Sequence, residues 1–142
     1  MRAAKYLGQI LRLDARVERK LAEKQHVLEL ATKITPSLSD MPRGGGPADK
    51  VGDAVARLVA LEAEIDRIVD ELIDARAEVL KLLETLPDDE HDVLHKYYVQ
   101  GQTIEAIADG MLPRPKTERQ IYRIKARALK RVQAILDERE TG

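Results

Sequence analysis

The sequence predicts an all-α fold, and three observations support this prediction. Leu, Ile, Val and Ala supply nearly all of the apolar residues, since the chain has no Phe or Trp and only four Tyr. Charged residues make up 35% of the chain, and a mixture rich in Ala, Glu, Lys, Leu and Arg is typical of long helices and coiled coils. Apolar residues recur at steps of three and four, the spacing that places them on one face of a helix.

The first predicted helix covers about residues 4–33. Its apolar stripe consists of Tyr6, Ile10, Leu13, Val17 and Leu21, is interrupted at Lys24 and resumes at Leu28, with Leu7 and Leu11 alongside. Thr35-Pro36 is expected to end this helix, because proline disfavours helical geometry in the residue before it. Residues 36–50 contain three successive glycines flanked by prolines, and this composition predicts a flexible loop.

The second predicted helix, residues 51–86, has the most regular pattern. Its apolar seam runs through positions 51, 54, 58, 61, 65, 68, 72, 75, 79, 82 and 86, and is widened by Val55, Val69, Ile73 and Leu83. A stripe of this length must be buried, either against the first helix folded back or against a second copy of the chain, and both alternatives stay open. Residues 1–86 are therefore predicted to form a helical hairpin or coiled-coil arm, which Leu86-Pro87 closes.

Residues 87–142 are predicted to form a module of three shorter helices. The first starts at an acidic run, which suits a helix N-terminus, and ends at Gly101. Its apolar face consists of Val93, Leu94, Tyr97 and Tyr98. The second starts after Thr103 as N-cap, with Ile104, Ile107 and Ala108 turned inward.

The third helix of the module follows the turn GMLPRPK. Thr117 is the expected N-cap, and Gln120 follows at the spacing of a capping box. The expected inward face consists of Ile121, Ile124, Ala128, Val132 and Ile135, with Leu129 alongside. Two short helices joined by a turn to a longer basic helix make the pattern of a helix-turn-helix domain.

Charge is distributed unevenly, although the formal net charge is only −1. Residues 1–50 contain ten Lys and Arg against six Asp and Glu, and residues 51–92 contain four against thirteen. Residues 113–136 contain eight against one, Glu118. Such asymmetry indicates contact with nucleic acid. A merely solvated helix would explain the presence of charge but not its single sign.

A helix-turn-helix domain places the N-terminal part of its last helix in the major groove of double-stranded DNA, while flanking basic residues contact phosphates. Arg and Gln carry the forked groups that match guanine and adenine edges. The predicted base-reading residues are Arg119, Gln120, Arg123 and Arg127. The predicted phosphate contacts are Arg114, Lys116, Lys125, Lys130, Arg131 and Thr103. The sequence thus predicts a sequence-specific DNA-binding regulator.

Residues 86–132 resemble the promoter-reading, region-four domain of bacterial sigma factors. The resemblance rests on Leu86-Pro87, Val93-Leu94, Tyr97, Glu105-Ala106-Ile107-Ala108, Ile121 and Arg127-Ala128-Leu129. The upstream stretches KYLGQILRLD, ITPSLSDMPRGGG and DKVGDAVARLVALEAEI are similar to uncharacterised phage and prophage proteins, which share the sigma-like module with ArpU/RinA-type regulators of phage late transcription. The resemblance implies a helix-turn-helix fold, a role in transcription, a phage origin and a place in the cytoplasm of a bacterial host.

The resemblance also allows a contact with host RNA polymerase, for which no residue gives separate evidence. In one respect the chain departs from the sigma-like pattern. Nine positions separate Ala108 from Thr117, more than is usual, so residues 109–116 form an enlarged turn stiffened by proline. This turn affects how the third helix meets DNA, and it places Arg114 and Lys116 for phosphate contacts.

The second helix predicts a homo-oligomer, with a dimer favoured through residues 51–86, which would present two basic helices to a palindromic or repeated site. The alternative is a phage assembly, packaging or adaptor protein whose long helix oligomerises. Its basic helix would bind DNA without sequence choice, or bind an acidic partner. No stretch approaches the roughly 18 uncharged apolar residues that span a membrane, so no membrane contact is predicted.

The stretch HDVLH is close to the HExxH zinc motif, because His91 and His95 are four residues apart with an acid beside the first. A zinc enzyme would also need a third ligand and a general base. The remaining histidine, His26, lies in another segment, and the sequence has no cysteine. We therefore expect two partly exposed histidines, and no catalysis, metal or cofactor.

Overall fold

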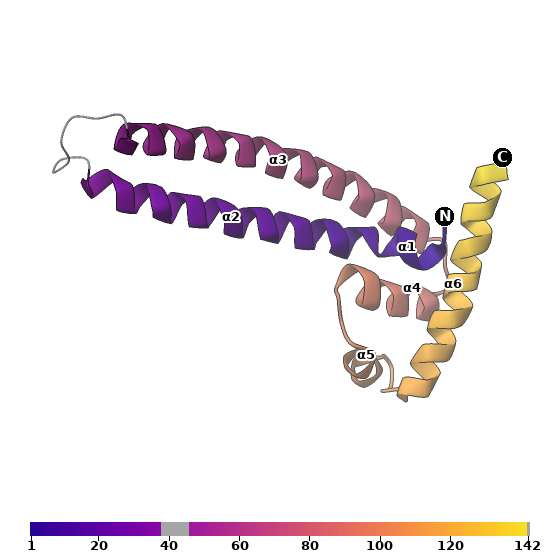
Figure 1. Cartoon of the computed structure of the whole chain (residues 1–142). Coiled ribbons are helices and arrows are strands. Elements are labelled where there is room, and N and C mark those ends of the chain that lie inside the picture. Colours follow the sequence, from indigo (N-terminus) through magenta and orange to yellow (C-terminus); the bar gives the residue numbers. More distant parts are fainter. Residues whose placement is uncertain (38–45, 142) are drawn as a thin grey trace. The chain divides into compact units, whose positions relative to one another are not determined.

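The structure, a computed structural model, describes residues 1–37 and 46–141, and every regular element in that part of the chain is a helix (Figure 1). The elements are α1 (Ala3–Leu7), α2 (Gln9–Ser37), α3 (Gly46–Leu83), α4 (Asp88–Leu94), the π-helix η1 (His95–Val99), α5 (Ile104–Gly110) and α6 (Glu118–Thr141). The predicted all-α class is confirmed. The chain forms two compact units, one of residues Leu13–Glu71 and one of Met1–Arg12 with Leu72–Gly142.

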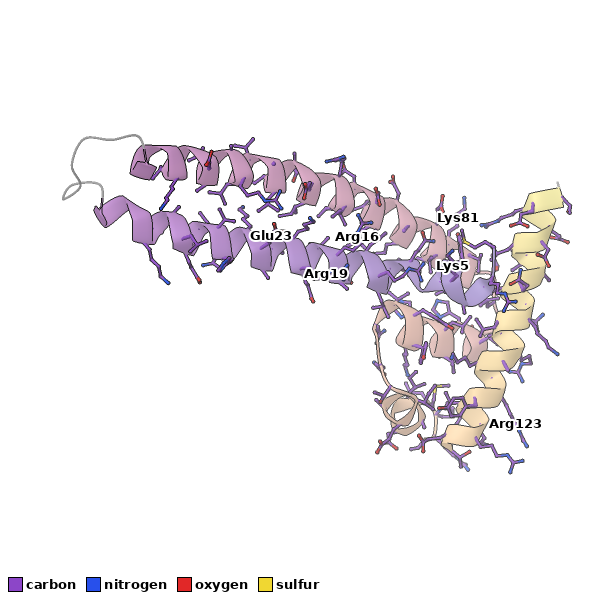
Figure 2. All side chains as sticks on the ribbon, viewed as in Figure 1. Lys5, Arg16, Arg19, Glu23, Lys81 and Arg123 are labelled. Atoms are coloured by element: carbon purple, nitrogen blue, oxygen red, sulfur yellow. The ribbon has the colours of Figure 1, made fainter. Side chains whose placement is uncertain are left out.

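In the Leu13–Glu71 unit, α2 and α3 lie side by side (Figure 1). The predicted seam positions of α3 are turned inward here: Ala54, Leu61 and Ile68 are buried, and Val51, Leu58 and Ile65 are half-buried. Among the described residues, four ion pairs join the helices: Lys20–Glu64 at 3.0 Å, Lys24–Glu62 at 3.3 Å, Arg16–Glu71 at 3.9 Å, and Arg57–Glu23. Figure 2 shows Arg16 and Glu23 on the side of α2 that faces α3.

The inward stripe of α2 differs from the predicted one beyond Val17. Leu21 and Leu28 are 48% and 39% exposed, so their predicted inward positions are wrong, and Lys20 and Lys24 are half-buried instead. Where two helices pack closely side by side, the positions in contact recur every 3.5 residues on average, so steps of three and four alternate. The predicted stripe takes two successive steps of four, from Leu13 to Val17 and from Val17 to Leu21, and this turns it away from α3. Lysines suit the inward positions because their aliphatic stems cover apolar surface while their ammonium groups reach carboxylates of α3.

The other unit has a core built from both ends of the chain. Its buried residues are Ala3, Tyr6, Leu7, Ile10, Val79, Leu82, Leu83, Leu86, Leu94, Tyr98, Val99, Ala128, Val132 and Leu136. The division therefore differs from the predicted boundary between residues 86 and 87. The reason is that α1 and the last turns of α3 share one apolar core with α4, η1 and α6.

The predicted first helix of the module is present as α4 followed directly by η1. Its predicted apolar face is confirmed, since Val93, Leu94 and Tyr98 are buried and Tyr97 is half-buried. The wider π-helical turn brings three successive residues, 97–99, to the core, which a period of 3.6 residues does not predict. Gly101 follows with a φ of +69°, a conformation that residues with a side chain rarely adopt, and so ends the element as predicted.

His95 has a hydrogen bond that requires a neutral ring. The Gln100 amide Nε2 lies 2.9 Å from His95 Nδ1, and since an amide nitrogen only donates, Nδ1 accepts. Burial, with smaller contributions from His91 and Arg76, lowers the pKa of His95 below its ordinary value of 6.5. The folded protein therefore takes up this proton at a lower pH than the unfolded chain does.

Acidification is expected to destabilise the protein through this residue. Because the folded pKa is depressed, the stability that neutral His95 contributes is complete above the unfolded pKa of about 6.5 and is lost as the pH falls through the folded pKa. We expect the midpoint of thermal unfolding to fall as the pH is lowered from about 7 to about 5, and to fall less in His95→Gln. His26→Gln, at an exposed position of α2, is the control and should keep the full pH dependence. Equal slopes in wild type and His95→Gln would show that other groups cause the effect.

A second apolar cluster lies among α4, α5 and α6. It consists of Val93, Ile104, Ile107, Ala108, Met111, Ile121 and Ile124. Thr103 caps α5 as predicted, since its hydroxyl accepts a hydrogen bond from the Ala106 N–H at 3.1 Å. The enlarged turn is held at both ends, because Met111 is buried in the cluster and the Lys116 N–H donates to the Ala108 carbonyl at 2.9 Å.

α6 begins with the predicted capping box. The Thr117 N–H donates to Gln120 Oε1 at 2.9 Å, and the Gln120 N–H donates to Thr117 Oγ1 at 3.1 Å. The buried residues of α6 are Ile121, Ile124, Ala128, Val132 and Leu136. Ile135, predicted to face inward, is half-buried and packs against the core, and Leu136 beside it is buried.

The predicted loop at 36–50 falls mainly on residues 38–45, which lie outside the described residues. On either side the helices are longer than predicted, since α2 continues through Pro36 and α3 begins at Gly46. Pro47 stands in the first turn of α3, where a missing N–H removes no hydrogen bond of the helix. In the described part of the chain, no helix has the length and apolar character needed to cross a membrane.

Candidate nucleic-acid interface

α6 carries most of the predicted DNA-contacting residues, and its helical period distributes them over different sides. We define the open side of α6 as Arg119, Arg123 and Lys130, which point away from the buried face. All three are exposed, and none has a hydrogen bond or ion pair with another described residue. Figure 2 shows Arg123 on the N-terminal half of the helix, at the edge of the module. The open side is thus a row of unneutralised cations.

The side of α6 toward α4 holds two arginines that are already paired. Arg127 Nη2 donates to Asp89 Oδ2 at 2.6 Å, and its Nε lies 3.6 Å from Glu90 Oε2. Arg131 Nε donates to Glu90 Oε1 at 2.9 Å. Arg127 is therefore already paired with acids of α4, unlike Arg119 and Arg123, with which the sequence had grouped it as a base reader. Its position relative to the acids of α4 could not be read from the helical period alone.

Glu90 anchors the start of α4 to α6. Only 1% of its surface is exposed, and both of its oxygens face arginines of α6. The hydrogen bond from Arg131 to Glu90, reinforced by the charge of the carboxylate, raises the pKa of Arg131. A buried carboxylate with two cationic partners holds its position, since removing the partners would leave a buried polar group unmatched.

Lys125, a predicted phosphate contact, lies at the inner edge of the helix. Its ammonium group is 4.1 Å from the centroid of the Tyr97 ring and 5.7 Å from that of Tyr98, and the residue is half-buried. A cation over an aromatic face is attracted by the ring's electron density. Burial also raises the pKa of Tyr98. Through these cation–π contacts, Lys125 of α6 packs against the two tyrosines of η1.

Two further candidates have roles in capping. The Thr103 hydroxyl accepts from the Ala106 N–H of α5, and Gln120 closes the capping box of α6 with its side-chain oxygen. A two-pronged contact with adenine needs that oxygen together with the amide nitrogen. The capping box engages the side-chain oxygen of Gln120, and base reading by this residue stays a prediction.

The turn before α6 supplies the remaining two candidates. Arg114 is exposed and has no hydrogen bond or ion pair among the described residues, whereas Lys116 is half-buried. Lys116 lines a cleft of about 250 Å³ together with Gln120, Arg123, Ile124 and Arg127 of α6 and Asp89 of α4. The structure therefore brings three predicted base readers, Gln120, Arg123 and Arg127, next to a predicted phosphate contact.

Two features of the interface were missed from the sequence. Tyr122 is 56% exposed beside Arg119 and Arg123, and the same period that turned those arginines outward could have identified it. Asp89 and Glu90 were treated as residues that suit a helix N-terminus, without regard to partners in α6. No local pattern indicates those partners, because they lie about 40 residues further along the chain.

The two histidines of HDVLH lie side by side, with ring centroids 5.7 Å apart and an angle of 20° between the rings. His91 Nδ1 is 3.3 Å from Asp92 Oδ1, and His95 Nδ1 accepts from Gln100. Among residues 1–37 and 46–141, no group of three or more His, Cys, Asp or Glu residues could hold a metal ion.

Comparison with known proteins places the chain in one family. No curated protein and no solved structure matches it. A family model described as "Protein of unknown function (DUF1492)" matches residues 32–133, from the C-terminal part of α2 into α6, and thus covers more than half of the chain. The chain therefore belongs to the DUF1492 family.

Proposed function

We propose that the protein is a sequence-specific DNA-binding regulator of transcription whose α6 lies in the major groove. The observation that supports this most is the open side of α6, where Arg119, Arg123 and Lys130 are exposed without anionic partners among the described residues. Three cations in a row on one face create a positive potential that attracts anions, and DNA is a polyanion whose major groove admits an α-helix. The short helix α5 and the turn before α6 complete the helix-turn-helix order.

A solvated helix face accounts for these charges less well. Between Glu118 and Asp137, α6 contains no acidic residue. The acids of α4 that meet the helix pair with Arg127 and Arg131 and with none of the three open-side residues. Acids of α4 thus neutralise Arg127 and Arg131, whereas Arg119 and Arg123 on the open side have no acidic partner among the described residues. That selectivity favours an external anionic partner.

Roles follow from position along α6. Arg119 and Arg123 lie in its first turns, the part that enters the groove in helix-turn-helix proteins, and are assigned to guanine edges. Tyr122 lies between them, where its ring suits a thymine methyl group. Lys130 and Arg114 are assigned to backbone phosphates on either side. The resemblance to sigma region four and to phage regulators supports transcription as the process, and extends the proposal to host RNA polymerase as a further partner.

The test is selection of bound fragments from random double-stranded DNA, followed by titration of the selected fragment and an unrelated one against salt. A sequence reader should recover one motif and keep its preference as salt rises. Binding through phosphates alone weakens alike on every sequence. Recovery of no motif, with equal loss on both fragments, would favour an adaptor or packaging protein that binds DNA by charge.

We further propose that the protein acts as a dimer through α3. Val55 and Val59 lie one turn apart on that helix and are 53% and 63% exposed, so an apolar strip stays uncovered after α2 has packed. A two-fold dimer would present two copies of α6, and the selected motif should then contain two half-sites. Sedimentation equilibrium gives the mass independently. A monomer mass together with a single half-site would contradict the dimer but leave DNA reading intact.

A further inference from the structure

The cleft between the start of α4 and α6 concentrates positive charge. We call it the phosphate niche and define it by Lys116, Gln120, Arg123, Arg127 and Asp89. Arg123 and Arg127 are four residues apart and so are neighbours on the surface of α6, while Lys116 comes from the turn before it. Three cations and one carboxylate line the niche, which leaves a net charge of +2.

The Asp89 carboxylate supplies the negative charge inside the niche and pairs with Arg127. Its Oδ2 lies 2.6 Å from Arg127 Nη2, the distance of a charge-assisted hydrogen bond. Arginine binds a carboxylate and a phosphate through the same planar fork of N–H groups. The Asp89–Arg127 pair therefore shows that an oxygen anion fits at this position, whereas Lys116 and Arg123 have no anionic partner among the described residues.

We propose that the niche binds one phosphate group of the DNA backbone, and that this phosphate displaces the Asp89 carboxylate from Arg127. The inference rests on the proposed DNA-binding function and changes the role of Arg127 from reading a base to gripping the backbone. A phosphate diester carries the same charge as the carboxylate that it replaces. It also reaches Lys116, which Asp89 leaves unpaired.

Asp89 and Glu90 differ in burial, and for this reason only Asp89 is expected to move when the phosphate binds. The side chains of Asp89 and Arg127 are 41% and 53% exposed, so water already competes for their ion pair and the pair is easily exchanged. Glu90 is 1% exposed and held by Arg131, so it remains in place and keeps α4 attached to α6. Phosphate entry therefore needs only a change of the Asp89 side chain and no rearrangement of helices.

The first experiment compares Asp89→Asn with Asp88→Asn. Both remove one negative charge from the first turn of α4, but Asp88 is exposed and has no ion pair among the described residues. We expect Asp89→Asn to tighten binding about two- to fivefold, the worth of one exposed ion pair, equally on the selected and the unrelated DNA. Asp88→Asn should have a clearly smaller effect. Equal effects of the two variants would overturn the proposal.

The second experiment identifies the phosphate. Single backbone phosphates of the selected fragment are replaced one at a time by neutral methylphosphonate, and each fragment is titrated with wild type and with Arg127→Gln. At one position the replacement should weaken wild type but cause no further loss in Arg127→Gln, because the two changes remove the same contact. Additive losses at every position would contradict the niche.

The two proposals fail in different ways. If wild type binds no DNA at low salt, the proposed function fails and the niche with it. If wild type binds DNA but neither experiment distinguishes its paired variants, only the niche is wrong. Thermal unfolding of Arg127→Gln serves as a control for folding, since Arg131 still holds Glu90 in that variant.

Discussion

Replacing Arg123 with alanine should flatten the sequence preference of DNA binding. Arg123 is exposed in the second turn of α6 and has no ion pair to release before it reaches DNA. A two-pronged arginine–guanine contact contributes about 1–3 kcal/mol of discrimination, so affinity for the selected fragment should fall roughly 5- to 150-fold. Affinity for unrelated DNA should fall much less. Fluorescence anisotropy on both fragments at one salt concentration measures the difference.

The matched control is Lys130→Ala on the same open side. Lysine contributes a point charge to phosphates, so its loss should weaken both fragments about equally and reduce the salt slope by about 1. If Arg123→Ala kept the preference of wild type, Arg123 would not contact a base, and the assignment of α6 as the reading helix would need revision.

Leu7→Ala should cost about 2–5 kcal/mol of the free energy of unfolding, the usual range for a leucine removed from a packed core. Leu7 is fully buried in a core that also contains Leu83, Leu94 and Val132. The truncation would leave a cavity that the surrounding helices cannot close. Urea denaturation of the full chain, followed by circular dichroism, measures the loss.

Leu21→Ala is the control for this experiment. The same substitution at a position that is 48% exposed should change the free energy of unfolding by no more than about 0.5 kcal/mol. Similar losses in the two variants would mean that the start of the chain does not belong to the core of the Leu72–Gly142 segment. A large loss only in Leu7→Ala would establish that the first residues are part of the folded module.

The features that the sequence predicted well depend on neighbours within one helix. The Thr117–Gln120 capping box, the Thr103 cap and the inward face of α6 are set by residues three or four positions apart, so a single segment contains all the information. The same holds for Arg119 and Arg123, whose outward direction follows from the inward direction of Ile121 and Ile124.

The features that the sequence did not predict depend on partners far along the chain. Leu21 and Leu28 continue a good amphipathic pattern, but the period imposed by α3 places Lys20 and Lys24 inward instead. Arg127 carries the same chemistry as Arg123, and only the packing of α4 on α6 decides that it meets Asp89. Nothing near Leu7 indicates that it completes a core with residues from the opposite end of the sequence.

The lysines in the seam of α2 also constrain how the chain can change in length. Lys20 and Lys24 meet Glu64 and Glu62 because the two helices run in opposite directions at one fixed alignment. Sliding one helix past the other by a turn would separate these charges and leave the lysine ammonium groups without their carboxylate partners. An insertion or deletion in one helix would break these ion pairs unless the other helix changed in length as well. The four ion pairs thus link the length of α2 to the length of α3, although the two helices lie on either side of a glycine-rich stretch in the sequence.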